Sequence, residues 1–505
     1  MKTMMDRVAT VMGGLMLAGV ALSPALAQQL TVTSTKLPAG QGNPYVATGG
    51  IDLSHLFAFF DPLFTVDGAT GGVVPALGLS YQNKSPTLWE IKLRPNVKFI
   101  NGRPLDAEAI ATVINYLGTD EGKTSQMARE IKYIKSARAV DPLTLEVETA
   151  QPNPTMMREF SFSVFGDHKA FLDMGAAAFA RNPVGSGPFK VTSWTAERVS
   201  STANTDSWRK PQVEGLNFVS LPDKTTRVQA LLSNQVQIAI YLGFDDRKTL
   251  EDRGFDFVVT PGDAVHVIRY NMFEDSPLKD IRVRQALNYG TNRKSLVDNL
   301  LGGLVKQGSQ PARSGTSGHD PSIAPYAFDP SKAKALLTEA GYPNGFNIVS
   351  EVYASEADNR DAFNQVGQDL AKIGVKVEFV EIQLPDMVSK ALGRAPYKSA
   401  MTNIYYRAGY QMDGMRPVNT LGNACGAIKF WCDEAITPII NAANQEFDDK
   451  KREALAHQVM KRYHDQAAAL FLYEDYNIYA KTKNVNVKPF RAGIDAPWHT
   501  VTFSK

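Results

Sequence analysis

The sequence contains few of the residues from which catalytic and metal sites are usually built. Among its 505 residues there are two cysteines and seven histidines. His457 and His464 lie seven positions apart in a segment with helical spacing, but without the H-E-x-x-H pattern of a zinc helix. No G-x-S-x-G motif of a serine hydrolase occurs either. We therefore expect no metal ion, no cofactor and no enzymatic activity.

An excess of charge of either sign is also absent. The 54 lysines and arginines nearly balance the 52 acidic residues, which gives a formal net charge of +2. Proteins that bind nucleic acid usually carry a clear basic excess, so we expect no nucleic-acid partner. With 44% hydrophobic residues, a chain of this length can form a packed core and should contain more than one domain.

Long apolar runs are missing except at the N-terminus. Lys2 and Arg7 precede an apolar run over 8–22, and the run is followed by the small residues of "SPALA" at 23–27. A bilayer span needs about 20 apolar residues, so this shorter run is typical of a cleavable signal peptide over 1–27. We expect cleavage after Ala27 and a soluble protein in the periplasm.

The two cysteines, Cys425 and Cys432, both lie in the expected mature chain. Exported proteins meet an oxidising compartment, which favours a disulfide between them. Two free thiols are an alternative. A redox or metal pair is a further alternative, although it would be expected to show C-x-x-C spacing or nearby histidines.

The segment "RNPVGSGPFKV" at 181–191 concentrates glycine and proline around Ser186. A phosphate-binding loop would require a helix directly after its glycines, with the helix N-terminus facing the anion. Here the residues after Gly187 alternate between apolar and polar, which indicates a strand. The segment is therefore interpreted as a bend between two parts of the chain.

The second half of the sequence alternates helical and strand patterns. Residues 280–303 predict two helices, with Asp280 and Asn292 as N-caps. A strand over 346–353, a helix that ends before Gly374 and a strand beginning at Val375 then form a βαβ unit. Such a unit requires parallel strands joined by a crossover, so we expect an α/β protein with at least two lobes.

Several of these segments resemble one family. "NPVGSGPFKV", "DKTTRVQALLSNQVQIAI", "VRQALNYGTNRKSLVDNLLGG" and "DPSKAKALLTEAGYPNGF" occur in the order and at the spacing typical of extracellular solute-binding proteins, family 5. This class serves ATP-driven (ABC) importers of peptides, nickel and opines. The resemblance covers nearly the whole expected mature chain.

The resemblance implies a two-lobed clamshell of the periplasmic binding protein type, with an extra small domain inserted in the first lobe. The segments "VIRYNMF" and "LFLYEDY" would be the two strands that cross between the lobes. The implied divisions are lobe I at 28–56, 182–270 and 471–505, an inserted subdomain at 57–181, and lobe II at 271–470.

The resemblance also suggests where a ligand binds. In "YYRAGYQMDG", Arg407 would pair with a ligand carboxylate and Asp413 with a ligand ammonium. The tyrosines of this segment would line the cleft, and two residues of the N-terminal segment would reach it. These further candidates are Tyr405, Tyr406, Tyr410, Asn43 and Tyr45. The alternatives are a glycine-rich surface loop with solvated charges, half-buried tyrosines and, at 43–45, a plain turn.

The implied function is capture of short peptides or amino-acid conjugates such as opines, and their delivery to an inner-membrane permease by a monomeric protein. The same fold could instead bind another cargo, such as a sugar, a nickel chelate or haem. A secreted hydrolase of similar size is the alternative from another class.

Overall fold

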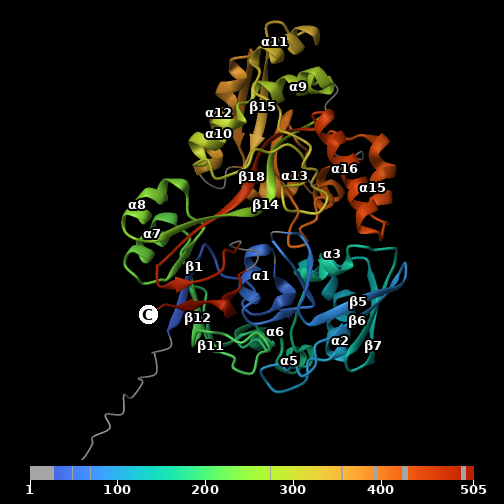
Figure 1. Ribbon diagram of the computed structural model, residues 1–505, viewed down its shortest axis with the longest axis vertical. Helices are drawn as coiled ribbons and strands as arrows, with labels where there is room; N and C mark the ends of the chain where they lie inside the picture. Colours follow the sequence, from blue (N-terminus) through green and yellow to red (C-terminus); the bar gives the residue numbers. More distant parts are fainter. Residues whose placement is uncertain are drawn as a thin grey trace, which may run out of the picture.

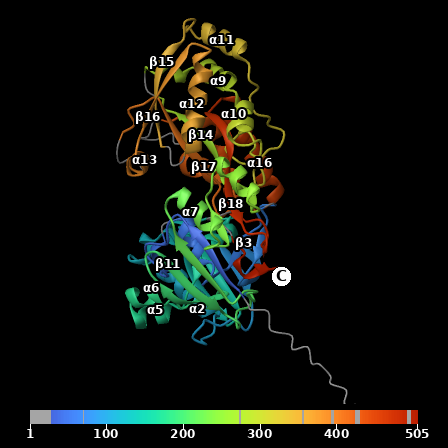
Figure 2. The ribbon, with the colours of Figure 1, turned by 90° about the vertical axis from the view of Figure 1, so that its left-hand side faces the viewer.

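The computed structural model describes residues 28–47, 49–68, 70–272, 275–353, 357–391, 396–422, 430–490 and 496–504. The expected signal peptide at 1–27 and Cys425 lie outside these residues, so the cleavage site and the disulfide with Cys432 stay predictions. The described chain forms two lobes, one above the other, joined by long strands (Figures 1 and 2).

Lobe I, the lower body in Figure 1, is built on one end of a ten-stranded sheet. Its central strand β1 (Gln29–Ser34) pairs in parallel with β12 (Gly215–Ser220), from Gln29 opposite Gly215 to Ser34 opposite Ser220. The other strands and two flanking helices of this part are β10 (Phe189–Trp194), β11 (Arg198–Ala203), β13 (Ile238–Ile240), α7 (Lys224–Leu232) and α8 (Arg247–Asp252).

Two long antiparallel strands connect the lobes. They are β14 (Asp256–Tyr270) and β18 (Ala469–Lys481), paired from Asp256 opposite Lys481 to Arg269 opposite Ala469. Figure 2 shows both passing from the lower body into the upper one. The crossing strands expected from "VIRYNMF" and "LFLYEDY" are thus confirmed as neighbours, although β14 ends at Tyr270.

Lobe II continues the same sheet with β17 (Met401–Arg407), β15 (Phe346–Val352) and β16 (Val375–Glu381). The expected βαβ unit is confirmed, because β15 and β16 are parallel and α12 (Ala357–Ala371) joins them. The helices packed around these strands are α9 (Ile281–Gly290), α10 (Arg293–Leu300), α11 (Pro330–Glu339), α13 (Leu384–Ala391), α15 (Thr437–Ala443) and α16 (Asp449–Asp465). Asp280 and Asn292 cap α9 and α10 as predicted.

Residues 57–181 include a separate antiparallel sheet of four strands in the order β5-β6-β8-β7. Its elements are β5 (Gly78–Ser85), β6 (Leu88–Leu93), α2 (Ala107–Leu117), β7 (Ile134–Asp141) and β8 (Thr144–Thr149). The core beneath this sheet is continuous with the core beneath β1 and β12. The four-stranded sheet is therefore distinct from the ten-stranded sheet, while the two share one hydrophobic core. The domain limits implied by the family resemblance stay predictions.

Further helices of lobe I lie between these two sheets or at the outer end of the lobe. They are α1 (Gly50–Leu56), α3 (Gln126–Glu130), α4 (Met156–Glu159), α5 (His168–Met174) and α6 (Ala176–Arg181). Two short strands, β3 (Phe64–Val66) and β4 (Val73–Pro75), form a hairpin beside them. In Figure 1, α1 and α3 face lobe II.

The bend at 181–191 is confirmed, and its glycines have a packing reason. The amide of Gly187 donates to the carbonyl of Phe59 over 2.9 Å. A Cβ on Gly185 would lie 2.1 Å from that same carbonyl oxygen, and one on Gly187 would lie 2.4 Å from its carbon. Only glycine allows so close a backbone approach. Strand β10 follows directly, so the segment lacks the helix that a phosphate-binding loop requires after its glycines.

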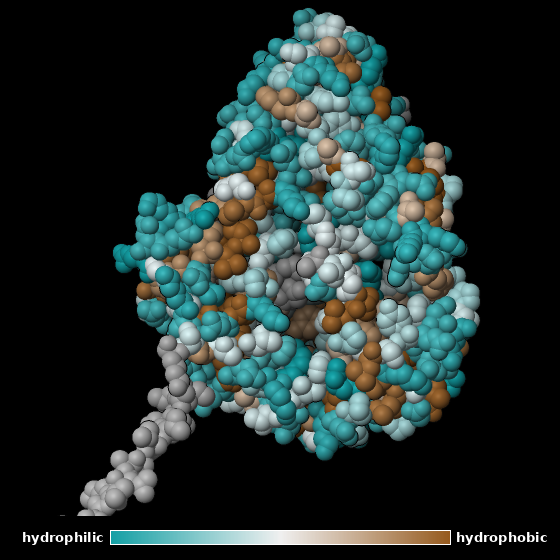
Figure 3. Space-filling model, viewed as in Figure 1, coloured by the Kyte–Doolittle hydropathy of each residue, from teal (hydrophilic) through white to brown (hydrophobic). Residues whose placement is uncertain are grey.

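The surface is hydrophilic over most of both lobes, and hydrophobic residues gather beside the region where the lobes meet (Figure 3). Within the described part of the chain, no helix is long and apolar enough to cross a membrane.

Candidate ligand-binding site

A cavity of about 380 Å³ lies where the two lobes meet. Its walls come from α1 and α3 of lobe I, from the crossing strands β14 and β18, and from β17 with the segment that follows it. Three carboxylates and two guanidinium groups line it, so the cavity is rich in charged groups of both signs. They belong to Glu130, Asp263, Asp475, Arg407 and Arg416.

Strand β17 explains which of the predicted tyrosines reach the cavity. Side chains alternate across a strand, so Tyr405 and Arg407 share the face that lines the cavity. Tyr406 points the other way, where its side chain is 2% exposed in the hydrophobic core of lobe II. Tyr406 is therefore a core residue and does not line the cavity.

Arg407 is held between two carboxylates. Its Nη1 donates to Asp263 Oδ1 over 2.5 Å and lies 3.9 Å from Asp475 Oδ2. Desolvation alone would lower the pKa of Arg407, but the charges of Asp263 and Asp475 outweigh it and raise that pKa. The guanidinium also lies over the ring of Tyr405, 4.9 Å from its centroid. About half of the Arg407 side chain remains exposed, which leaves it accessible to a ligand.

Asp475 is fixed by a histidine that the sequence did not single out. His266 Nε2 lies 2.9 Å from Asp475 Oδ1. The imidazole stacks on Tyr473 at 4.3 Å and meets the edge of Tyr405 at 4.6 Å. Burial alone would raise the pKa of Asp475, but the hydrogen bond and charge of His266, together with Arg407, lower it. Asp475 is thus an ionised group in the wall of the cavity.

Gly262 makes room for this carboxylate. A Cβ at Gly262 would lie 2.2 Å from Asp475 Oδ2, well inside van der Waals contact. The register between β14 and β18 shifts between Pro261 and Val265, which brings Asp263 out beside Asp475. This irregularity therefore places both carboxylates against Arg407.

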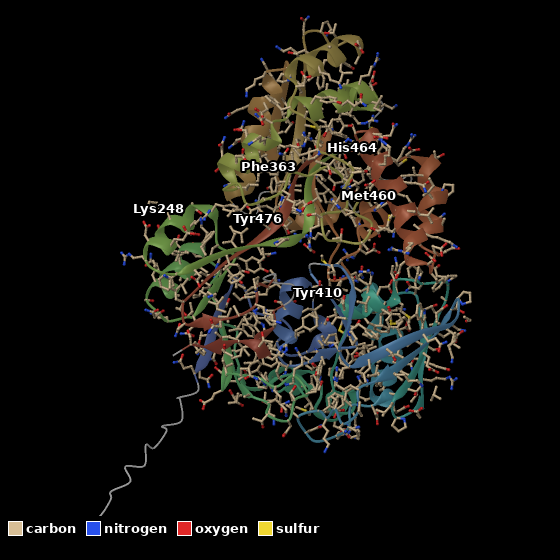
Figure 4. All side chains as sticks on the ribbon, in the orientation of Figure 1. Lys248, Phe363, Tyr410, Met460, His464 and Tyr476 are labelled. Atoms are coloured by element: carbon tan, nitrogen blue, oxygen red, sulfur yellow. The ribbon has the colours of Figure 1, made fainter. Side chains whose placement is uncertain are left out.

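The far end of the cavity is closed by contacts between the lobes. Tyr410 lies where the lobes meet, beside α1 (Figure 4), and its hydroxyl donates to the carbonyl of Gly50 over 2.5 Å. Gln411 Nε2 and Arg416 Nη2 each lie 2.9 Å from the carboxylate of Glu130. The segment after β17 thus forms a wall of the cavity and also joins it to α3.

Asp413 lies outside the cavity. It is 5% exposed, and its Oδ2 accepts a hydrogen bond from Arg452 of α16 over 2.8 Å. Its Oδ1 accepts from the amide of Met415 over 3.0 Å. Burial would raise the pKa of Asp413, but Arg452 and Arg158 lower it. Asp413 is a buried structural partner of Arg452 and does not line the cavity.

Asn43 and Tyr45 also lie away from the cavity. Asn43 accepts a hydrogen bond from the amide of Tyr45 at the start of a single helical turn. The Tyr45 hydroxyl lies 3.0 Å from His168 Nδ1, and its ring packs against Tyr116 and Phe171. The turn interpretation therefore fits this segment, and both residues are buried in lobe I.

Of the predicted residues, the structure brings Arg407, Tyr405 and Tyr410 to the cavity. The prediction missed Arg416, which is close to Arg407 in sequence. It also missed Asp263, His266, Asp475 and Glu130, which come from strands or a helix far from Arg407 in sequence. Among the described residues, no group of three His, Cys, Asp or Glu side chains is arranged to hold a metal ion.

Comparison with known proteins identifies the architecture around this cavity. The family model for bacterial extracellular solute-binding proteins, family 5 Middle, matches residues 72–423. The chain belongs to this family. Family 5 relatives include the glutathione-binding protein GsiB of Pectobacterium atrosepticum, 25% identical over 400 residues, which cover 77% of this chain and 76% of GsiB. The dipeptide-binding protein of Escherichia coli is 27% identical over 362 residues, which are 67% of this chain and 66% of that protein.

Solved family 5 structures confirm the two-lobed fold. The ABC transporter substrate-binding protein CtaP from Listeria monocytogenes aligns with a TM-score of 0.84 at 20% identity, over 95% of this chain and all of CtaP. DppA from Helicobacter pylori in complex with the peptide STSA aligns at 0.75 and 21% identity, over 95% of this chain and 98% of DppA. The resemblance to family 5 and the α/β clamshell expected from the sequence are confirmed, while the inserted domain stays a prediction.

Proposed function

We propose that this protein is the substrate-binding component of an ABC importer and captures a small zwitterionic cargo, such as a dipeptide or an amino-acid conjugate. The observation that carries the proposal is the half-exposed Arg407 guanidinium, held by two carboxylates inside a cavity between the lobes. A fixed charge in a desolvated cleft binds an opposite charge strongly and rejects a like one.

The cavity offers groups for both ends of a zwitterion. Arg407 would bind the carboxylate of the cargo, while Asp475 would accept its ammonium. Asp475 is suited to this because it lies 3.9 Å from Arg407 and retains its negative charge. At about 380 Å³ the cavity is at the small end of the range for ligand sites, which favours a cargo of dipeptide size.

The relatives support this class of cargo. Two of them are described as a glutathione-binding and a dipeptide-binding protein, and both ligands are peptides with free charged groups. A structural neighbour, AgaA, was solved in complex with agropinic acid. Another, NikA from Staphylococcus aureus, was solved with Ni(L-His)2, so a nickel chelate is the second cargo to test.

In this proposal the signal peptide at 1–27 directs the chain to the periplasm, where it acts as a monomer. The lobes close on the cargo about β14 and β18, because the closed state adds contacts from the second lobe. The closed form then delivers the cargo to an inner-membrane permease, without catalysing a reaction on it.

The proposal is tested by calorimetry on protein that has been unfolded, freed of ligand and refolded. Ala-Ala should bind, while N-acetyl-Ala-Ala and Ala-Ala amide should each bind about 10- to 100-fold more weakly, since each lacks one charge. Arg407→Gln should weaken Ala-Ala binding by a similar factor and should no longer discriminate against the amide. Arg247→Gln, on the exposed face of α8, is the matched control.

Binding of neither Ala-Ala nor glutathione would contradict the proposed class of cargo. Binding of Ni(L-His)2 alone would favour the chelate instead. Hydrolysis of peptide or ester substrates by the purified protein would contradict a purely binding role.

A further inference from the structure

A second cavity lies in lobe I, beside the ligand cavity. Its volume is about 440 Å³, and it is formed by the β3–β4 hairpin, by the segment around Trp208 and by residues near the C-terminus. We call it the side chamber. Apolar side chains form much of its lining, among them Phe57, Val66, Val74, Trp208 and Pro497.

Two of the charged groups at the side chamber, Arg209 and Asp67, have partners within the protein, whereas Lys488 is exposed. Arg209 is paired with the fully buried Asp61 over 2.6 Å and also donates to the carbonyls of Phe57 and Phe60. Asp67 is bound within its own turn by the amide of Thr70. Arg94, which does not itself line the chamber, lies over the ring of Trp208, 4.1 Å from its centroid. The side chamber therefore offers a largely apolar surface, in contrast to the charged ligand cavity.

Tyr410 is a shared wall of the two cavities. Its ring lies between Phe57, which lines the side chamber at a centroid distance of 5.8 Å, and Phe162, which lines the ligand cavity at 5.2 Å. Phe57 and Phe162 belong to lobe I, whereas Tyr410 belongs to the segment after β17 in lobe II. The ring that divides the two spaces is thus carried by the opposite lobe.

The separation of the two cavities by Tyr410 therefore depends on whether the two lobes are closed. If the lobes separated about β14 and β18, Tyr410 would move away with lobe II and would no longer divide the ligand cavity from the side chamber. When the lobes close, the ring returns to its place between Phe57 and Phe162. A ligand group that enters the side chamber in the open state is then covered by Tyr410.

We infer that the side chamber is a second subsite, which takes an apolar side chain of the cargo, and that Tyr410 is the lid over it. The inference rests on the proposed function and narrows the cargo to amphipathic zwitterions, with charged groups at Arg407 and Asp475 and one aromatic or branched aliphatic arm. Tyr410 therefore acts as a specificity-determining residue.

The test compares dipeptides that differ only in an apolar arm. Ala-Phe and Phe-Ala are titrated against Ala-Ala by calorimetry with the full chain. At least one of the two should bind about tenfold more tightly than Ala-Ala. Val74→Trp should abolish that preference while leaving Ala-Ala affinity unchanged, because Val74 lines the side chamber only and is 39% exposed, so the larger ring fills space without disturbing the core. Val140→Trp, at a 51% exposed position of β7 that lines neither cavity, is the matched control.

A second measurement does not depend on the cargo. Crystals of the wild-type chain soaked in bromobenzene should show anomalous bromine density in the side chamber, and Val74→Trp crystals should not. Ala-Ala binding without any preference for Phe overturns the side chamber as a subsite and leaves the proposed function standing. If bromobenzene occupies the side chamber but no dipeptide binds, the proposed function is overturned, and so is the inferred amphipathic zwitterionic cargo. Absence of bromine density from the wild-type chamber overturns the apolar site itself.

Discussion

Glu130 of α3 and Arg416, which follows β17, form an ion pair across the two lobes, with 2.9 Å between Oε1 and Nη2. Both residues also line the ligand cavity. Arg158 adds a hydrogen bond to the carbonyl of Gln411 over 3.2 Å. The same short segment, 410–416, therefore supplies a wall of the cavity and contacts that keep the lobes together, so closure and ligand enclosure are physically linked.

Glu130→Gln should shift the ligand-free protein toward the open state. The carboxylate of Glu130 is largely buried, and a hydrogen bond to a charged group contributes about 1.5–3 kcal/mol, so the closed state should lose stability of that order relative to the open one. Small-angle scattering of ligand-free protein should then give a larger radius of gyration than wild type. Glu251→Gln, in an exposed pair within α8, should not change it. Identical scattering from Glu130→Gln and wild type would show that this pair does not hold the lobes closed.

Asp413→Asn should destabilise the fold rather than weaken binding selectively. Asp413 and Arg452 are each 7% exposed at the side chain, and breaking a buried pair by removing one charge costs about 3–5 kcal/mol. Chemical denaturation at neutral pH should show a loss of this order. Because the folded pKa of Asp413 is lowered, its contribution is present above the unfolded pKa and is lost as the pH falls through the folded value.

The control for Asp413 is Asp465→Asn, which removes an exposed partner of Lys461 at the end of α16. It should change stability by less than about 1 kcal/mol. If Asp413→Asn instead abolished dipeptide binding with an unchanged free energy of unfolding, Asp413 would belong to the site after all.

The fold could be predicted from the sequence where local patterns sufficed. The caps Asp280 and Asn292, the βαβ unit ending in β16 and the bend before β10 all depend on residues close together in the chain. The shared core of residues 57–181 and the rest of lobe I could not be foreseen, because it forms between side chains from distant segments.

The candidate site could be predicted only in part for the same reason, because its residues come from segments that are distant in sequence. Arg407 was found because it lies in a short recognisable segment, but its partner Asp263 is 144 residues away. His266 and Asp475 meet only because β14 pairs with β18. A carboxylate that lines a cavity and one that is neutralised by a buried arginine look alike in sequence, so Asp413 could not be separated from Asp475 before the position of Arg452 was known.

Reduction should lower the melting temperature if Cys425 and Cys432 are bonded. A disulfide that closes so short a loop stabilises the folded state by about 2–3 kcal/mol on a chain-entropy basis. The difference between scans with and without reductant should vanish in the Cys425→Ser/Cys432→Ser double variant. Rapid alkylation of both cysteines in the native, unreduced protein would show free thiols instead.

Glu159 should make the protein less stable as the pH rises toward neutrality. This residue of α4 is 7% exposed, and it accepts hydrogen bonds from Asn153 over 2.8 Å and Thr155 over 3.0 Å. Burial raises its pKa to about 7. The folded state therefore keeps a proton that the unfolded chain loses above about pH 4.3, and stability falls between that pH and about 7 by about 3 kcal/mol.

Glu159→Gln should remove this pH dependence, because glutamine is neutral, of similar size and able to bond with both Asn153 and Thr155. Urea denaturation at pH 4.5, 6 and 8 should show the variant near wild type at the lowest pH and more stable than wild type at the highest. Glu148→Gln, at an exposed partner of Lys135, is the control and should keep the wild-type slope above pH 5. If Glu159→Gln kept that slope as well, Glu159 would be ionised in the folded protein throughout this range, and its buried position would have to be balanced by a cation that approaches it.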